Sequence, residues 1–121
     1  MKKSLVKEKS FEFSLTVIQL YKFLQDNKEF VISKQLLRSG TSIGANICEA
    51  LAGESRADFI HKMAIASKEA RETIYWLELL QKSNLITFNY EKHIQDCTSL
   101  VKMLTNIVHT TKTNSKPKPQ M

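Results

Sequence analysis

Two pairs of side chains in this 121-residue sequence have types and spacings that suit metal chemistry. Asp58 and His61 form a D-x-x-H pair, and His93 and Cys97 lie four residues apart. A di-iron helical bundle needs two E-x-x-H motifs and two further inward carboxylates, and a structural zinc site needs four ligands. Neither set is complete, so the sequence predicts no metal site and no cofactor. The serines have no paired base and no G-x-S-x-G elbow, so we also predict that the chain is not an enzyme.

A second candidate for chemistry is the glycine-containing stretch SGTSIGANICEA, residues 39–50. A phosphate loop needs G-x-x-x-x-G-K-[ST] after a strand, but Gly40 and Gly44 are four apart and no Lys-Ser or Lys-Thr follows. Both glycines instead fall on the apolar face of a helical pattern, where they would let another helix approach closely; the alternative is that they are incidental. The small residues of a later segment are the predicted partners: Ala66, Ser67 and Ala70.

The basic residues suit phosphate contacts, and most of the excess charge lies at the two ends of the chain. Residues 1–9 carry four lysines and one glutamate, residues 110–121 carry three lysines and no acid, and the body is neutral. Basic arms can hold nucleic-acid backbones, although solubilising tails are an equally good interpretation. No nucleic-acid recognition motif accompanies them. The candidate phosphate contacts are Lys2, Lys3, Lys7, Lys9, Arg38, Arg56, Lys112, Lys116 and Lys118.

The elements that must position these residues are helices. The chain has only three glycines and two prolines, and apolar residues recur at helical spacing over four segments: roughly residues 11–25, 33–52, 55–82 and 88–109. Ser33 and Ser55 suit N-caps, and Gly53 suits a helix stop. Short connections favour an antiparallel up-down four-helix bundle over residues 10–109, with a basic N-terminal arm over residues 1–9 and a basic disordered tail over residues 110–121.

Three features are candidates for contacts beyond those of a single bundle. The apolar arc of the first segment covers roughly 200°, about twice the width of one buried face, so this helix is either deeply central or meets another subunit. Trp76 lies off the main apolar stripe and is a candidate subunit contact. A polar stripe at i, i+4 and i+7 is either an exposed face or a hydrogen-bond ladder, at a helix packing edge or between subunits: Ser42, Asn46 and Glu49, bordered by Arg38.

The sequence also favours a cytoplasmic location. Its basic start has no apolar h-region of a signal peptide, and no apolar run approaches the roughly 18 residues of a membrane span. Two cysteines, Cys48 and Cys97, are too few for a disulfide framework.

Residues 36–80 resemble the bacterial four-helix-bundle family named for proteins encoded in intervening sequences of 23S ribosomal RNA. The first marks form an S-I-x-x-N-I-x-E core: Ser42, Ile43, Asn46, Ile47 and Glu49. Further marks follow in the next segment: Ser55, Asp58, Phe59, Ile65, Ala66, Glu69, Ala70, Glu72 and Thr73. The resemblance implies an up-down four-helix bundle that assembles as a ring-like homopentamer, with no catalytic residues to carry over.

The same superfamily resembles the accessory protein of diversity-generating retroelements, a basic pentamer that binds nucleic acid and a reverse transcriptase. The neutral body of this chain departs from that pattern. We therefore expect a non-enzymatic oligomeric bundle associated with RNA, DNA or a protein that handles one. The alternative is a structural homo-oligomer with protein partners only.

Overall fold

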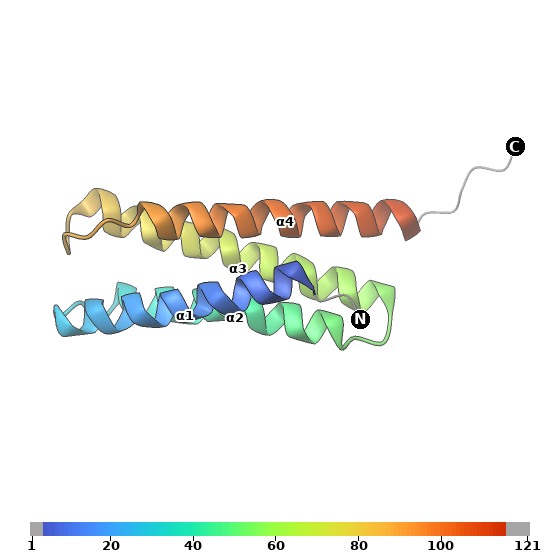
Figure 1. Cartoon of the computed structure of the whole chain (residues 1–121), viewed down its shortest axis with the longest axis horizontal. Helices are drawn as coiled ribbons and strands as arrows, with labels where there is room; N and C mark the ends of the chain where they lie inside the picture. Colours follow the sequence, from blue (N-terminus) through green and yellow to red (C-terminus); the bar gives the residue numbers. More distant parts are fainter. Residues whose placement is uncertain (1–3, 116–121) are drawn as a thin grey trace, which may run out of the picture.

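The chain forms four antiparallel helices packed side by side. The computed structural model describes residues 4–115, and the helices are α1 (Leu5–Asp26), α2 (Ile32–Leu51), α3 (Arg56–Ser83) and α4 (Glu91–Ser115). Each helix runs back along the one before it, so the start of α1 and the end of α4 lie at the same end of the bundle (Figure 1). The fold confirms the predicted all-α four-helix bundle. None of the described helices is both long and apolar enough to cross a membrane.

One continuous apolar core runs through the centre of the bundle. Side chains at helical spacing on α1, such as Val17 and Leu24, are completely buried, because they lie on the side that faces the other helices. Each fully buried aliphatic side chain of this size contributes about 1.5–3 kcal/mol relative to exposure. The helices are therefore held by packing over their whole length, with α1 and α4 sharing the least extensive of the four helix–helix contacts.

The first helix and the last helix both extend further than the sequence predicts. Helix α1 begins at Leu5, where the Ser4 hydroxyl caps it by accepting a 3.3 Å hydrogen bond from the Lys7 backbone N–H. Residues 5–9, which we assigned to an arm by their charge, are thus helical, and Val6 is buried in the core. At the other end α4 continues to Ser115, so residues 110–115 are helical and not a disordered tail. Residues 1–3 and 116–121 lie outside the described part of the chain.

The helix caps agree with the sequence at α3 and differ at α2. The Ser55 hydroxyl accepts a 3.0 Å hydrogen bond from Asp58 N–H at the start of α3, as predicted. Ser33, the predicted cap of α2, instead lies inside its first turn. The buried Glu29 carboxylate accepts hydrogen bonds from the N–H groups of Val31 and Ile32, both 3.0 Å, and of Ser33, 2.6 Å. It satisfies three donors that a serine cap could not reach together.

The end of α2 also differs from the expected glycine stop. Its C-cap is Ala52, in right-handed backbone geometry, and Gly53 does not adopt a positive φ. A β-carbon at Gly53 would lie 2.4 Å from an Asp58 carboxylate oxygen and 3.2 Å from the Ala50 carbonyl oxygen. This glycine is therefore required by the close approach of the α3 start and not by a left-handed turn.

Helix α2 is continuous through both of its internal glycines, as predicted, but the helix they allow to approach is α1. A β-carbon at Gly40 would lie 2.9 Å from both methyl carbons of Val17. At Gly44 the nearest atoms are the Ser10 hydroxyl, 3.4 Å away, and the Ser14 hydroxyl, 3.6 Å away. The predicted contact with α3 is thus wrong, because the glycines lie on the flank of α2 that faces α1.

The small residues of α3 have a different role. Ala66 and Ala70 are completely buried, and the backbone of Ala70 is close to α4, where its carbonyl oxygen accepts a hydrogen bond from the Cys97 thiol at 3.2 Å. An alanine at this position leaves room for the sulfur atom to reach the backbone. The α3–α4 contact is therefore tightened by alanine, as the α1–α2 contact is tightened by glycine.

Candidate functional site

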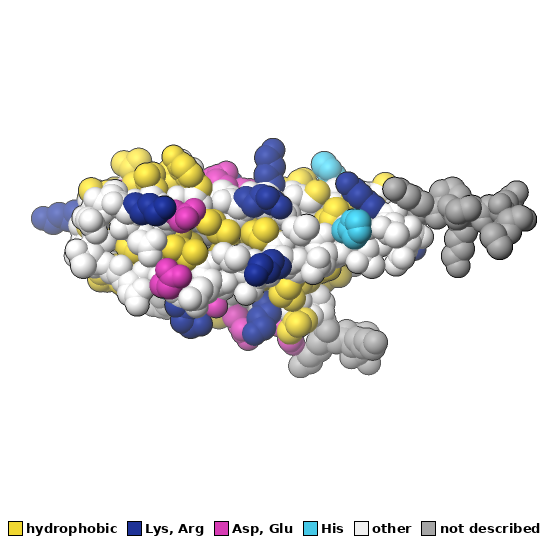
Figure 2. Space-filling view, turned by 90° about the horizontal axis from the view of Figure 1, so that it is seen from above, with side chains coloured by type: hydrophobic (Ala, Val, Ile, Leu, Met, Phe, Trp, Pro, Cys, Tyr) yellow, Lys and Arg dark blue, Asp and Glu magenta, His cyan; other side chains and the backbone are white. Residues whose placement is uncertain are grey.

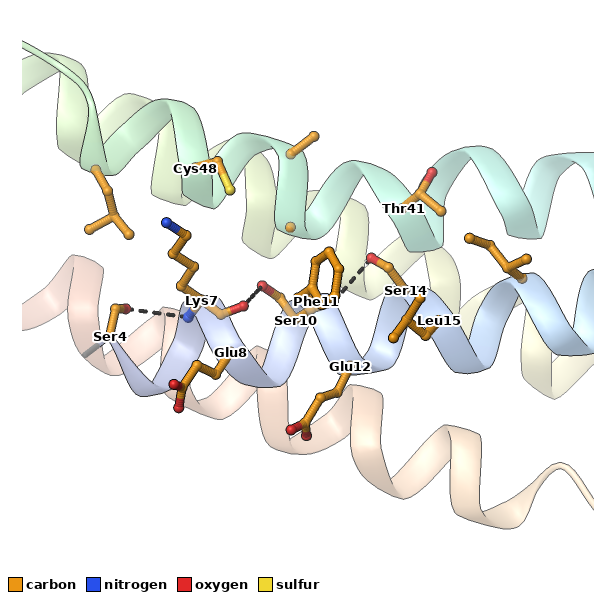
Figure 3. Close-up of a pocket in the computed structure, with 14 residues that line it drawn as sticks. Ser4, Lys7, Glu8, Ser10, Phe11, Glu12, Ser14, Leu15, Thr41 and Cys48 are labelled. Carbon is orange, nitrogen blue, oxygen red and sulfur yellow. Dashed lines mark hydrogen bonds between the residues drawn. The ribbon is translucent and has the colours of Figure 1, made fainter.

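An open groove runs between the first half of α1 and the second half of α2. It has a volume of about 1170 Å³, and its large apolar side chains come mainly from α1. Phe11 and Leu15 are 64% and 50% exposed. In Figure 3, Lys7 reaches toward α2, whereas Glu8 and Glu12 point away from it. The lining residues are Ser4, Lys7, Glu8, Ser10, Phe11, Glu12, Ser14, Leu15, Ile18, Thr41, Gly44, Ala45, Cys48 and Leu51.

The floor of this groove consists of small residues whose polar atoms already have partners. The Ser10 hydroxyl donates to the Lys7 carbonyl oxygen and the Ser14 hydroxyl to the Ser10 carbonyl oxygen, both at 3.0 Å (Figure 3). Between them Gly44 contributes no side chain at all. A surface of this kind offers shape and apolar area without charge-specific recognition. It suits an apolar helix edge better than a polar small molecule.

The exposure of the groove residues decides between the two interpretations of the wide apolar arc of the first helical segment. Its wide apolar arc does not make α1 a central helix, because Phe11 and Leu15 are exposed on the single chain. Their contact with another subunit stays a prediction. The sequence identified these apolar residues through their excess over one buried face. It did not reveal the floor beside them, because Ser10 lies before the predicted first segment, residues 11–25.

A charged cluster joins α2 to α3 on another side of the molecule. Arg38 donates to the Glu69 carboxylate at 3.0 Å and also pairs with Glu72. The Trp76 indole N–H donates to the same Glu72 carboxylate at 3.0 Å. That hydrogen bond is the main cause that lowers the pKa of Glu72, and the two carboxylates raise the pKa of Arg38. Glu69 and Glu72 are thus paired groups.

The predicted polar stripe borders this cluster at a helix packing edge. Ser42 donates to the Arg38 carbonyl oxygen at 2.6 Å, and Asn46 donates to the Ser42 carbonyl oxygen at 2.8 Å. Glu49 pairs across to Lys62 of α3 at 3.6 Å. The Ser42 hydroxyl and the Asn46 amide therefore donate hydrogen bonds within α2, whereas Arg38 and Glu49 form ion pairs with α3. These exposed pairs contribute at most about 1 kcal/mol each, so they orient α2 against α3 without dominating stability.

The candidate phosphate contacts separate into three groups. Lys7, Lys9, Arg56 and Lys112 lie on helix segments at the end of the bundle where α1 begins and α4 ends (Figure 1). Arg38 lies in the middle of α2 and is occupied by two carboxylates. The remaining candidates fall outside the described residues: Lys2, Lys3, Lys116 and Lys118.

A shallow pocket of about 420 Å³ opens at this same end, between the start of α3 and the end of α4. It is lined by Arg56, Phe59, Thr111 and Asn114. The Thr111 hydroxyl donates to the Ile107 carbonyl oxygen at 2.7 Å, so the guanidinium and the Asn114 amide are the groups that suit hydrogen bonding to an anion such as a phosphate group. Arg56 is exposed, so its charge remains available to solvent and to ligands.

The pair His93 and Cys97 lies inside the α1–α4 and α3–α4 contacts and not in an open site. Cys97 is fully buried, and burial raises the pKa of its thiol to about 12. His93 Nδ1 is the one buried side-chain nitrogen or oxygen that lacks a partner among residues 4–115. No group of three or more potential ligand side chains that could hold a metal occurs in the described part of the chain. The structure thus places both residues among packed side chains.

Burial lowers the pKa of His93, against the raising influence of a backbone hydrogen bond with Thr16 and of the Asp96 charge. Below the ordinary histidine pKa of about 6.5, the unfolded chain therefore takes up a proton that the folded chain resists. The free energy of unfolding should fall as the pH drops below this value, down to the folded-state pKa. We expect a His93→Gln variant to show a smaller decrease between pH 7 and pH 5 in urea-denaturation midpoints. A His61→Gln variant, changed at an exposed histidine, should follow the unmodified chain; equal slopes for all three proteins would contradict the prediction.

A second exposed apolar cluster lies at the opposite end, where the α1–α2 and α3–α4 connections meet. Figure 2 shows hydrophobic side chains at this end of the molecule and also along the middle of the visible face, among charged side chains of both signs. We call the cluster the loop-end patch; its exposed members are Phe30, Val31, Leu85 and Phe88. The helical spacing of the sequence does not reveal it, because Phe30, Val31 and Leu85 lie in connections between the periodic segments.

The comparisons with known proteins agree with this architecture. The family model described as 23S rRNA-intervening sequence protein matches residues 2–106. A solved structure of a Bacteroides thetaiotaomicron protein of the S23 ribosomal protein family, described as having unknown function, is 57% identical, with a TM-score of 0.82. The match covers 86% of this chain and 98% of that one. None of the curated proteins matches. Four packed helices, and a family match that extends over nearly all of them, place this chain in the 23S rRNA-intervening sequence protein family.

Proposed function

We propose that this chain is a cytoplasmic, non-enzymatic bundle that self-associates and contacts nucleic acid through the end of the bundle where α1 begins and α4 ends. The observation that carries the proposal is the convergence of the two basic segments. Residues 1–9 and 110–121 hold the whole net charge of +6, and the start of α1 and the end of α4 lie at one end of the bundle (Figure 1). Three lysines of these segments are described by the structure, Lys7, Lys9 and Lys112, and they lie on the helix segments at this end.

Convergence matters because electrostatic attraction to phosphate depends on local charge density. The Debye length is about 8 Å at physiological salt, so lysines on separate ends of a long bundle would act independently. Lysines that share one end act on the same stretch of backbone and release counterions from it together. The pocket beside Arg56 adds a guanidinium group at this end. We propose sequence-independent contact with RNA or DNA, since these groups recognise phosphate and not base edges.

Self-association is the second part of the proposal, and the apolar groove supports it. Large apolar side chains next to a floor of small ones form a surface that another helix can cover. For this family we expect a homopentamer. A ring would bring several basic ends onto one face, which would multiply weak phosphate contacts through effective concentration.

The charge proposal is tested by neutralising lysines without shortening the chain, because removal of residues 1–9 would also remove the buried Val6. In one variant Lys2, Lys3, Lys116 and Lys118 become glutamine. In the matched control the same number of lysines is changed at the opposite end: Lys22, Lys28, Lys34 and Lys92. We expect the first variant alone to lose affinity for RNA and duplex DNA, with the slope of log K against log salt reduced by about 0.7–0.9 per phosphate contact removed.

Two results would overturn the charge proposal. Equal losses in both variants would mean that general charge and not the converged ends attracts the nucleic acid. No binding by the unmodified chain at low salt would favour the alternative function, a structural homo-oligomer with protein partners only. The loop-end patch is the feature that supports this alternative, since exposed apolar clusters mark protein contacts.

A further inference from the structure

The outer face of α3 carries a strip of exposed residues in which basic side chains flank an aromatic ring. We call it the α3 strip; its members are Lys68, Arg71, Tyr75, Leu79 and Lys82, and all are exposed. At 100° per residue they fall within one narrow sector opposite the buried face of the helix. Lys68 and Lys82 each lie seven residues from Tyr75, so the strip extends about 21 Å along the helix axis with the tyrosine at its centre.

Two of the three cations of the strip have no partner among the described residues. Glu69 and Glu72 are paired with Arg38, and Glu72 also accepts the hydrogen bond from Trp76. Neither Arg71 nor Lys82 has a hydrogen-bond or ion-pair partner within residues 4–115. Glu78 is the exposed acid that remains on this side of α3. Arg71 and Lys82 therefore face solvent without a partner among the described residues, while Lys68 also acts on the Glu72 carboxylate four residues further on.

Tyr75 is held in a way that suits a stacking platform. Its side chain is 57% exposed, while its ring contacts Trp76 edge-to-face with centroids 4.9 Å apart and an interplanar angle of 71°. Trp76 is itself fixed by its hydrogen bond to Glu72. A ring supported from one side loses little conformational freedom when a flat group stacks on its open face.

From these features we infer that the α3 strip binds single-stranded nucleic acid. Tyr75 stacks on one base, and Lys68, Arg71 and Lys82 contact phosphates on either side of it. The inference rests on the proposed function and names the form of nucleic acid and a site separate from the basic end. Exposed aromatics among cations are the usual means of binding single strands without sequence preference. A duplex keeps its base faces stacked inside, so Tyr75 can add affinity only for unpaired strands.

The test compares Tyr75→Ala and Tyr75→Phe in the full-length chain, with a uniform oligo-dT or oligo-U strand and a duplex of equal length at low salt. We expect Tyr75→Ala to bind the single strand about 5- to 150-fold more weakly, the loss that corresponds to one base stack. Tyr75→Phe retains the ring, so its affinity for the single strand should lie within about twofold of that of the unmodified chain. Duplex affinity should not change. The emission of Trp76, the single tryptophan of the chain, should respond to the single strand in the unmodified protein.

Each other outcome decides against the inference in a distinguishable way. Unchanged single-strand affinity in Tyr75→Ala, alongside a loss when the end lysines are neutralised, would overturn the α3 strip and leave the proposed function standing. Absence of all nucleic-acid binding by the unmodified chain would overturn both. A lower oligomer mass for Tyr75→Ala in light scattering would assign this face to contact between copies of the chain instead.

Discussion

Replacing Gly40 with alanine should destabilise the bundle by up to about 2 kcal/mol, because overpacking a well-filled core costs about 1–3 kcal/mol and alanine recovers about 1 kcal/mol of helix propensity. The added β-carbon would lie 2.9 Å from both methyl carbons of Val17. Val17 is completely buried, and a β-branched side chain in a helix has one strongly preferred rotamer. It cannot turn away, so α1 and α2 must separate. The measurement is the free energy of unfolding from urea denaturation.

Gly44→Ala is the matched control, because it changes the same residue type in the same helix one turn further on. Its β-carbon would meet Ser10 and Ser14 atoms at 3.4–3.6 Å, which is ordinary contact. Alanine also removes the cost of glycine in a helix, about 1 kcal/mol, so this variant should equal or exceed the unmodified chain in stability. A Gly40→Ala variant as stable as Gly44→Ala would show that the two helices do not cross as closely as described.

Introducing charge into the α1–α2 groove should abolish self-association. In a Phe11→Lys, Leu15→Lys double variant, the two large apolar side chains at the groove edge are replaced by groups that are costly to bury without a partner. Both positions are exposed on the single chain, so the fold itself should be retained, with an unchanged helical circular-dichroism spectrum. Light scattering of the unmodified protein should give a mass that is a multiple of the 13.9 kDa chain mass, five times that mass for a pentamer. The variant should have the mass of a single chain.

Val31→Lys provides the control for that experiment. Val31 is 74% exposed and belongs to the loop-end patch, so it tests whether any charge on an apolar surface has the same effect. We expect this variant to keep the mass of the unmodified protein. Dissociation by Val31→Lys but not by the α1 variant would move the subunit contact to the loop-end patch. A monomeric unmodified chain at micromolar concentration would remove self-association from the proposed function.

The elements were predictable because they depend on periodicity, which a single sequence contains. The stripes that include Val17, Ile43 and Leu104 mark buried helix faces, and Ser55 marks a helix start through a local hydrogen bond. The contact made by each flank was harder to predict. Gly40 and Gly44 indicate close packing, but which helix approaches depends on how α2 is rotated in the bundle, and this rotation is set by all four helices together.

The helix ends and the charged clusters show a second limit. The glutamate cap of α2 was missed because Glu29 lies in the connection, where its burial depends on how the chain folds back and not on spacing. Arg38 was expected to be available to phosphate, but the sequence does not show that Glu69 and Glu72 lie beside it. Conversely, the apolar excess around Phe11 was visible from the sequence. It follows from comparing the width of the apolar arc with the width that one buried face requires.

The even number of antiparallel helices has a practical consequence for labelling and fusion. Because α1 starts and α4 finishes at the same end of the bundle, affinity tags or reporter domains added at the two termini would both be attached to the basic end and could screen its lysines. A reporter inserted between Asn84 and Asn89, in the connection before α4, would stand about 35 Å away, at 1.5 Å per helical residue. Such an insertion would leave the basic end open to an approaching strand.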